Sequence, residues 1–342
     1  MRYLTSLYVT DHRARVSSSQ GSLLVFGGDG KRTRVPMSVL EAIVLVGHAQ
    51  VTNDALAECV RRHIRVSSLS RAGRIRFTVG GATSGNVHLR LAQFEAVQNA
   101  NLRIGVARAM VAGKLQNSRR MLKRWSWDAS TLERRHLENL ADAIAERIAK
   151  VAGTEDGDRL RGIEGAGTRL YFQGLGHHLD ASGVSLPFQR RTRRPPRDPV
   201  NSLLSFTYGL LTTEVTGALE TVGLDPQLGF LHGVRPGRPS LALDILEELR
   251  PSIADRFVVG LLCRRRLSTR DFVVTAGGAC YLRDASRQLL LDAYEEYKSE
   301  EIRHPLIEQR VQRGMIASVQ AVLLARHLRG DLPAYPPFVL SD

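Results

Sequence analysis

The chain has 342 residues, of which 43% are hydrophobic, which is enough for two domains and a large core in at least one of them. Its 48 basic and 34 acidic side chains give a formal net charge of +14. A surplus of this size favours a polyanionic partner such as nucleic acid. No apolar run approaches the roughly 20 residues that a membrane helix needs.

The cysteines and the N-terminus indicate the compartment. Cys59, Cys263 and Cys280 are widely spaced and form no CxxC pair, which argues against a disulfide framework and against a zinc site. The first residues are polar and alternating, unlike a signal peptide. We therefore expect a soluble cytoplasmic protein with reduced thiols and no membrane association.

The N-terminal part is predicted to be rich in strands. Residues 3–9, 23–26 and 75–79 are short and rich in β-branched and aromatic side chains. One helix interrupts them, with Thr52 as its N-cap and apolar residues recurring at helical spacing up to residue 63. The run of small residues at 80–85 predicts a domain boundary.

The character of the chain changes after this boundary. Residues 86–151 are nearly free of proline and show a helical period, and further helices are predicted at 159–177, 199–222, 240–262, 287–302 and 306–330. The sequence thus predicts an α+β protein with a β-rich domain at 1–84 and a larger all-helical domain at 85–342. The Arg-rich, Pro-containing segment 189–197 is predicted to be an extended loop.

One predicted helix carries several carboxylates. The helix should begin at Ser240 as its cap, with an apolar stripe on one face and Asp244, Glu247 and Glu248 on the other. His232 lies just upstream in a loop rich in Gly and Pro, from which it could approach the acidic face. These side chains suit a divalent cation. The alternative is a solvated acidic face with an unrelated loop histidine.

Two further segments carry chemistry. Glu164 lies in Ile-Glu-Gly-Ala-Gly, on a predicted helix whose small residues allow close backbone approach, and no cationic neighbour is obvious one turn on. The basic loop holds five arginines beside prolines, an arrangement suited to a phosphate backbone or, alternatively, to an exposed linker. These arginines are Arg190, Arg191, Arg193, Arg194 and Arg197.

Taken together, three motifs resemble one family. They are Glu164 in its glycine-rich context, the run Arg-Arg-Pro-Pro-Arg-Asp-Pro-Val-Asn-Ser-Leu-Leu-Ser-Phe, and His232 ahead of Ser-Leu-Ala-Leu-Asp-Ile-Leu-Glu. In this order they resemble the CRISPR-associated endonuclease/integrase of spacer acquisition, the "Cas one" family. The residues within these motifs are most similar to those of subtype I-C members. The match covers about half the chain, and Tyr-Pro-Pro-Phe near the C-terminus fits it as well.

The resemblance implies a metal-dependent enzyme. The metal ligands of the family fall on Glu164, His232 and Glu247, with Asp244 as a supporting acidic position and Arg250 as a basic position near the scissile phosphate. Mg²⁺ or Mn²⁺ would be the cofactor. The third ligand is aspartate in some relatives and glutamate here, which leaves its geometry open.

The resemblance also implies partners. It predicts a homodimer, with dimerisation and partner contacts in the N-terminal domain, and a small ferredoxin-like second adaptation protein that bridges two dimers. An accessory adaptation nuclease is a further candidate partner. The substrate would be double-stranded DNA, both the spacer precursor and the repeat into which it is inserted.

Two other functions compete with this interpretation. A metal-dependent nuclease acting on branched DNA in repair would have the same site but would cleave without joining. A non-catalytic basic DNA-binding protein would have an acidic helix that is only a solvated face. Transesterification by a 3′-hydroxyl distinguishes the integrase, since water as nucleophile gives cleavage alone.

Overall fold

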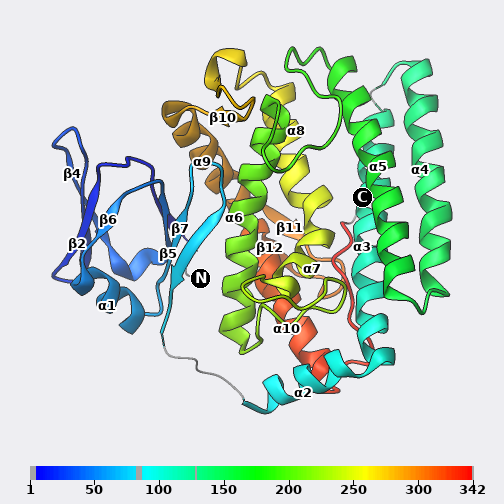
Figure 1. Ribbon diagram of the computed structural model, residues 1–342, viewed down its shortest axis with the longest axis horizontal. Helices are drawn as coiled ribbons and strands as arrows, with labels where there is room; N and C mark the ends of the chain where they lie inside the picture. Colours follow the sequence, from blue (N-terminus) through cyan, green and yellow to red (C-terminus); the bar gives the residue numbers. More distant parts are fainter. Residues whose placement is uncertain (1–4, 82–86, 128, 341–342) are drawn as a thin grey trace.

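The computed structural model describes residues 5–81, 87–127 and 129–340, and the N-terminal part of these forms two four-stranded sheets (Figure 1). One sheet has the order β1-β5-β7-β8, in which β1, β5 and β7 are parallel and β8 is antiparallel. The other has the order β4-β3-β2-β6. Their bounds are β1 Thr5–Val9, β2 Arg15–Ser19, β3 Ser22–Phe26, β4 Arg32–Pro36, β5 Leu40–Val46, β6 Gln50–Val51, β7 Arg65–Leu69 and β8 Ile75–Val79.

Strand β5 joins this part to the helices. Its side chains alternate between the two faces of the sheet, so that Ile43 and Leu45 belong to the core of the N-terminal part. Val44 and Val46 belong instead to the large core shared with the helices. A strand that is buried on both faces explains the nearly continuous apolar sequence from residue 42 to 46.

Helix α1 (Asn53–Arg61) begins where the sequence predicted. The Thr52 hydroxyl accepts a hydrogen bond from the backbone N–H of Ala55 at 3.2 Å, which confirms the cap. The predicted boundary at 80–85 falls largely on residues 82–86, which lie outside the described part of the chain. Among the described residues, strands precede that gap and long helices follow it.

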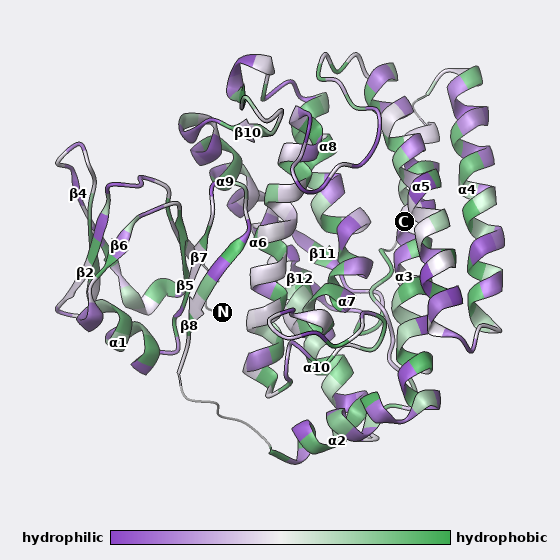
Figure 2. Ribbon diagram, in the orientation of Figure 1, coloured by the Kyte–Doolittle hydropathy of each residue, from purple (hydrophilic) through white to green (hydrophobic). Residues whose placement is uncertain are grey.

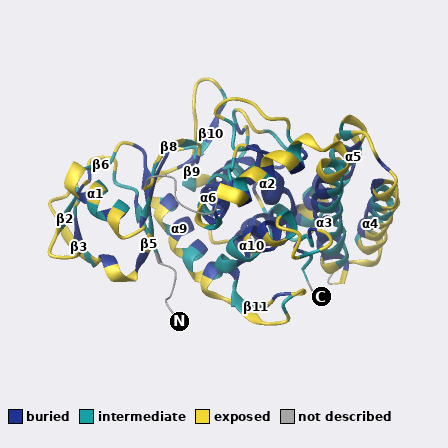
Figure 3. Cartoon of the chain, turned by 90° about the horizontal axis from the view of Figure 1, so that it is seen from below, coloured by how far each residue is buried: buried dark blue, intermediate teal, exposed yellow. Residues whose placement is uncertain are grey.

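The remainder of the chain is mainly helical, in agreement with the predicted α+β class. Three long helices lie side by side at one end of the molecule, and a second group surrounds α6 (Figures 1 and 3). Their bounds are α2 Val87–Gln98, α3 Ala100–Trp127, α4 Thr131–Ala152, α5 Gly157–Ala181, α6 Pro199–Val222, α7 Ser240–Leu249, η2 Arg250–Asp255, α8 Arg256–Cys263, α9 Asp284–Ser299 and α10 Ile316–Leu328. None of these described helices is both long and apolar enough to cross a membrane.

Helix α6 is the centre of this region, and its bounds match those predicted. Asp198 caps it by accepting a hydrogen bond from the N–H of Asn201 at 2.8 Å, and Pro199 takes the first helical position. Gly223 ends it with a φ of +91°, a left-handed conformation that glycine adopts without strain. The helix is largely buried (Figure 3), and it is pale in much of Figure 2 because Ser, Thr and Gly stand between its apolar residues.

The helical region departs from the predicted all-helical pattern in three places. Residues 240–262 form two helices separated by the π-helical segment η2, because Pro251 has no N–H to continue the α-helical hydrogen bonds. Two hairpins are also present, β9 (Phe272–Val274) with β10 (Cys280–Leu282) and β11 (Glu301–Arg303) with β12 (Arg310–Gln312). The second hairpin replaces the start of the helix predicted at 306–330, which begins only at Ile316.

The turn between β7 and β8 contacts α6 through two glycines. A Cβ added to Gly209 would lie 1.8 Å from the carbonyl oxygen of Gly73, and a Cβ added to Gly73 would lie 2.7 Å from the Cα of Phe206. The backbones of the turn and of α6 are therefore in direct contact, and no flexible side chain lies between them that could move aside for a Cβ. Only glycine at these two positions allows the sheet to approach the helix so closely.

We expect Gly209→Ala to destabilise the protein by about 2 kcal/mol or more, because the new methyl group must push the turn away from α6. Urea unfolding of the variant would measure the loss. Gly105→Ala, in the interior of α3, is the matched control because nothing lies within 4 Å of its added Cβ. The control should gain about 0.5–1 kcal/mol from helix propensity. Equal stability changes in the two variants would contradict the contact.

Candidate active site

The loop before α7 is held by one buried carboxylate. Asp244 accepts hydrogen bonds from the backbone N–H groups of Phe230, Leu231 and His232 at 2.6, 2.9 and 3.0 Å. It also lies 2.5 Å from Nδ1 of His232. Since an ionised carboxylate only accepts hydrogen bonds, Nδ1 must donate, and the lone pair of the imidazole is then on Nε2.

The start of α7 differs in detail from the prediction. Pro239 is the N-cap residue, and Ser240 is the first helical residue. The Ser240 hydroxyl donates to the carbonyl of Gly233 at 3.0 Å and so ties down the loop rather than capping the helix. A Cβ on Gly229 would lie 2.8 Å from Asp244 Oδ2, which explains why glycine stands at this close approach.

Glu247 faces two cations from different elements. Its Oε1 is paired with Arg250 of η2, and its Oε2 lies 2.6 Å from the Nζ of Lys114, a residue of α3. The Glu247 side chain is only 5% exposed. Burial opposes the charged form, but Arg250 and Lys114 outweigh it and hold the pKa of the Glu247 carboxyl below its usual value. Glu247 is therefore a buried carboxylate that stays ionised.

Glu164 of α5 reaches the same lysine. Its Oε1 pairs with the Lys114 ammonium and accepts a hydrogen bond from the Thr168 hydroxyl at 2.8 Å. Lys114 thus bridges Glu164 and Glu247, which are 83 positions apart in the sequence. His232 lies near enough to Glu247 that a positive charge on the imidazole would lower the pKa of that carboxyl. The structure places all three predicted ligands in one neighbourhood.

The donor set suits a divalent cation. Two carboxylates and one oriented imidazole are oxygen and nitrogen ligands that Mg²⁺ and Mn²⁺ accept. Oε2 of Glu247 is buried and receives no hydrogen bond of good geometry among the described residues, although the Lys114 ammonium lies close to it. In the described part of the chain no three His, Cys, Asp or Glu side chains converge closely enough to hold an ion. The residues therefore fit the metal chemically, and their role as ligands stays a prediction.

The carboxylates of α7 do not form one solvated face. Asp244, Glu247 and Glu248 are all buried, so the alternative of a solvent-exposed acidic surface is wrong. Glu248 points to the C-terminal segment, where it accepts hydrogen bonds from Tyr335 at 2.6 Å and Gln320 at 2.9 Å. Burial raises the pKa of Glu248 to about 8. Glu248 anchors the chain end, whereas its two neighbours serve the site.

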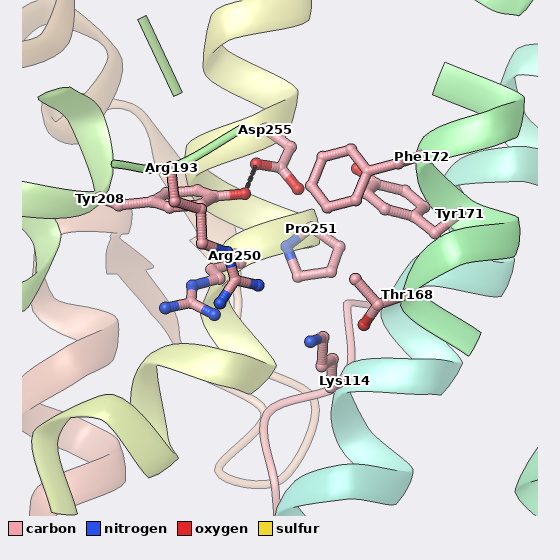
Figure 4. Close-up of a pocket in the computed structure, with 9 residues that line it drawn as sticks. All are labelled: Lys114, Thr168, Tyr171, Phe172, Arg193, Tyr208, Arg250, Pro251 and Asp255. Atoms are coloured by element: carbon pink, nitrogen blue, oxygen red, sulfur yellow. Dashed lines mark hydrogen bonds between the residues drawn. The ribbon is translucent and has the colours of Figure 1, made fainter. Parts of the chain in front are cut away.

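A fourth buried carboxylate, that of Asp255, lies beyond Arg250. Asp255, at the end of η2, accepts a hydrogen bond from the Tyr208 hydroxyl at 2.6 Å (Figure 4). The guanidinium of Arg250 lies over the Tyr208 ring at 4.8 Å, and that of Arg191 lies over it at 5.1 Å. Tyr208 thus fixes Arg250, which in turn pairs with Glu247. A small cavity lies here, and Lys114, Thr168, Tyr208, Arg250 and Asp255 all line it (Figure 4).

The buried state of Asp255 predicts a pH dependence of stability. Burial raises the pKa of Asp255 from its ordinary value of 3.8 to about 6. The folded protein therefore holds this proton more tightly than the unfolded chain. The bound proton of Asp255 therefore stabilises the folded protein by about 2–3 kcal/mol. This stabilisation is complete below pH 4 and is lost as the pH rises through about 6. Asp255→Asn, which keeps an acceptor for Tyr208, should lack this component.

Urea unfolding of the wild type and Asp255→Asn at pH 4 and pH 7 would test this expectation. The variant should be more stable relative to the wild type at pH 7 than at pH 4. A stability difference that does not change between these pH values would contradict the raised pKa.

The basic loop is extended, as predicted, but its arginines have different surroundings. Arg191 is half-buried and donates to Asn201 Oδ1 at 2.8 Å and Ser205 Oγ at 3.0 Å. Arg197 donates to the carbonyl of Gly277 at 3.3 Å. The side chains of Arg190, Arg193 and Arg194 are exposed. The loop is therefore tied to α6 and to the β9–β10 turn.

A groove of about 620 Å³ leads from the site to this loop. One wall is α5, including Glu164 and Arg169, and the other is the loop, including Arg190, Arg191 and Arg193. Because four arginines line the groove, it suits a phosphate backbone. The groove ends at Glu164, one of the metal ligands that the sequence predicted.

Two residues of the site were not found from the sequence. Lys114 lies among the buried apolar residues of α3 and is one of only five lysines in the chain. Its place in this apolar stripe is the only signal that could have identified it as a site residue. Tyr208 resembled an ordinary core residue of α6. The cationic neighbour that Glu164 appeared to lack one turn along its own helix is supplied by another helix.

The family model described as CRISPR associated protein Cas1 matches residues 7–296. The chain is 40% identical to "CRISPR-associated endonuclease Cas1 2" of Rhodospirillum rubrum, over 98% of each chain. It is 37% identical to a "Cas4/endonuclease Cas1 fusion" of Geobacter sulfurreducens, over 97% of this chain and 60% of that protein. The chain belongs to the Cas1 family of CRISPR-associated endonucleases.

Solved structures share the fold. A Cas1 protein from Thermotoga maritima superposes with a TM-score of 0.81 at 23% identity, covering 99% of each chain. A casposase bound to its integration product gives a TM-score of 0.83 at 19% identity, covering 96% of this chain and 92% of that one. A chain of a Cas6-RT-Cas1–Cas2 complex gives 0.81 at 21% identity, covering all of this chain and 36% of that one. These likenesses establish the α+β fold.

Proposed function

We propose that this Cas1 protein inserts new spacers into a CRISPR array by metal-dependent transesterification. The observation that carries the proposal is the convergence of Glu164 and Glu247, from distant helices, on one buried point beside His232. Two carboxylates and one imidazole form a set of oxygen and nitrogen donors that suits a divalent cation. The residues within the three sequence motifs further favour a subtype I-C system.

Glu164, His232 and Glu247 would hold Mg²⁺ or Mn²⁺. When bound, the metal supplies charge neutralisation at the phosphodiester and alignment of a nucleophile. Asp244 keeps the His232 imidazole oriented through Nδ1, so that His232 serves as a ligand and not as a general base. Arg250, fixed over Tyr208, would face the non-bridging oxygens of the scissile phosphate.

The DNA would approach along the basic groove. Exposed arginines of the loop and Arg169 of α5 line it, and phosphate contacts by such side chains position a strand without reading its bases. A 3′-hydroxyl brought to the site gives strand joining, whereas water gives cleavage. The same site therefore supports both integrase and nuclease activity.

We propose that the active assembly is larger than one chain. Joining a short duplex to two staggered positions needs two sites held at a fixed distance, which a homodimer bridged by a small ferredoxin-like protein supplies. One structural neighbour is a chain of a Cas6-RT-Cas1–Cas2 complex, which supports a Cas2-type partner. The Cas4 fusion of a relative supports an accessory nuclease as a further partner. Such an assembly acts on cytoplasmic DNA.

The test uses purified protein, a labelled duplex with a free 3′-hydroxyl and a supercoiled plasmid bearing repeats. With Mg²⁺ or Mn²⁺ we expect nicking or single-strand joining by the protein alone, and paired integration at a repeat boundary when the partner is added. EDTA should stop every product. Cleaved plasmid without attached label, even with partner and Mn²⁺, would favour a repair nuclease. DNA binding without any metal-dependent product would favour a non-catalytic DNA-binding protein.

A further inference from the structure

Lys114 is a buried cation placed between the two carboxylates of the site. It is only 4% exposed, pairs with Glu164, and lies 2.6 Å from Oε2 of Glu247. An ammonium group is costly to bury unless it is paired. Helix α3 therefore carries this lysine into the core at a position where two acceptors compensate its charge.

The charges of this cluster are balanced without a metal. Lys114 and Arg250 carry two positive charges, and Glu164 and Glu247 carry two negative ones. A divalent cation on the same oxygens would stand directly beside the ammonium. Like charges repel strongly where water is excluded. The ammonium and the metal therefore cannot share Glu164 and Glu247 in this arrangement.

We propose that Lys114 is an internal counter-cation that competes with the divalent metal for Glu164 and Glu247. The inference rests on the proposed metal-dependent function and deepens it. Lys114 keeps the two carboxylates together before the metal arrives, and metal binding must displace its ammonium. The flexible lysine stem allows this movement. The metal affinity of the site is then reduced by the stability of the lysine-bridged state.

A cavity of about 10 Å³, which has room for no more than a water-sized group, lies beside the site. Lys114, Thr168 and Arg250 all line this cavity (Figure 4). An ammonium that leaves the carboxylates remains close to Arg250, which faces the substrate phosphate in the proposed function. Lys114 would then exchange carboxylate partners for phosphate oxygens. It is a positioning residue in the metal-free protein.

The test measures Mn²⁺ binding without DNA. Full-length protein stripped with EDTA is titrated with Mn²⁺, and the free ion is followed by electron paramagnetic resonance. Lys114→Met should bind Mn²⁺ roughly tenfold more tightly or better than the wild type, because the Lys114 ammonium no longer competes for Glu164 and Glu247. Its melting temperature without metal should fall, and Mn²⁺ should raise it more than it raises that of the wild type. Lys114→Gln serves where the methionine variant does not fold.

Lys298→Met is the matched control. Lys298 is also buried and also bridges two carboxylates, Glu214 at 3.0 Å and Glu295 at 2.6 Å. This control should lose stability but keep wild-type Mn²⁺ affinity, and adding Glu164→Gln to Lys114→Met should abolish the gain. Unchanged affinity in the Lys114 variants, or an equal gain in Lys298→Met, overturns the competition. Absence of Mn²⁺ binding from every variant and the wild type overturns the proposed metal-dependent function instead.

Discussion

His232→Ala should reduce both strand cleavage and strand joining by roughly two orders of magnitude or more, while DNA affinity stays close to that of the wild type. The histidine is held by Asp244 through Nδ1 and through its own backbone N–H, so its ring is positioned before any ligand arrives. Its side chain is 22% exposed, and the three backbone hydrogen bonds by which Asp244 holds the loop do not need the imidazole. The loss should therefore fall on catalysis and not on folding.

The measurement combines plasmid nicking and strand joining in Mn²⁺ with DNA binding by fluorescence anisotropy. Asp244→Asn should give an intermediate loss of about 10–100-fold, because it weakens the orientation of the imidazole without removing it. His12→Ala, on a half-exposed histidine of the N-terminal part, is the control and should keep full activity. A His232→Ala protein that is folded and fully active would exclude the imidazole from the metal site.

The position of Asp244 shows what helical spacing can predict. Its separation from Glu247 by about one helical turn places it near the site on the basis of sequence alone. Its actual partners, three backbone N–H groups of the upstream loop, depend on how that loop folds back over α7. Periodicity gives the face of a helix, but it does not show which loop returns to that face. The prediction of a shared acidic face was wrong for Glu248 for the same reason.

Lys114 shows why part of the site was not predictable. Its contacts with Glu164 and Glu247 join residues that are 50 and 133 positions away in the sequence. They arise only when α3, α5 and α7 pack together, and no local pattern on α3 distinguishes a buried lysine from one that reaches solvent. The helices predicted at 159–177 and 199–222 are present at 157–181 and 199–222, because helical spacing acts locally.

The interruption after α7 has a local cause that a helical period alone conceals. Apolar spacing continues through residues 240–262, yet Pro251 removes one backbone donor and the chain forms the π-helical segment η2. This segment places Arg250 beside Glu247 and Asp255 beside Tyr208. The irregular turn thus positions two side chains of the site. An uninterrupted α-helix would have directed them differently.

Replacing Arg190, Arg193 and Arg194 together by alanine should weaken DNA binding about equally for all sequences and flatten its dependence on salt. The slope of log affinity against log salt changes by about 0.9 for each phosphate contact, or by roughly 3 for the three arginines. Their side chains are exposed, and Arg190 and Arg193 line the groove that ends at Glu164. Arg191 should act differently, because it is held by Asn201, Ser205 and the ring of Tyr208.

Binding of labelled duplex between 50 and 200 mM salt would measure the slopes. The control removes three other exposed arginines, Arg303, Arg310 and Arg326, which changes the net charge by the same amount away from the groove. Arg191→Ala should lower the melting temperature and leave the slope nearly unchanged, because its guanidinium already has protein partners. If both triple variants flatten the slope equally, the affinity comes from the overall charge of +14. If only the loop variant does so, the groove beside Glu164 is the path of the DNA strand.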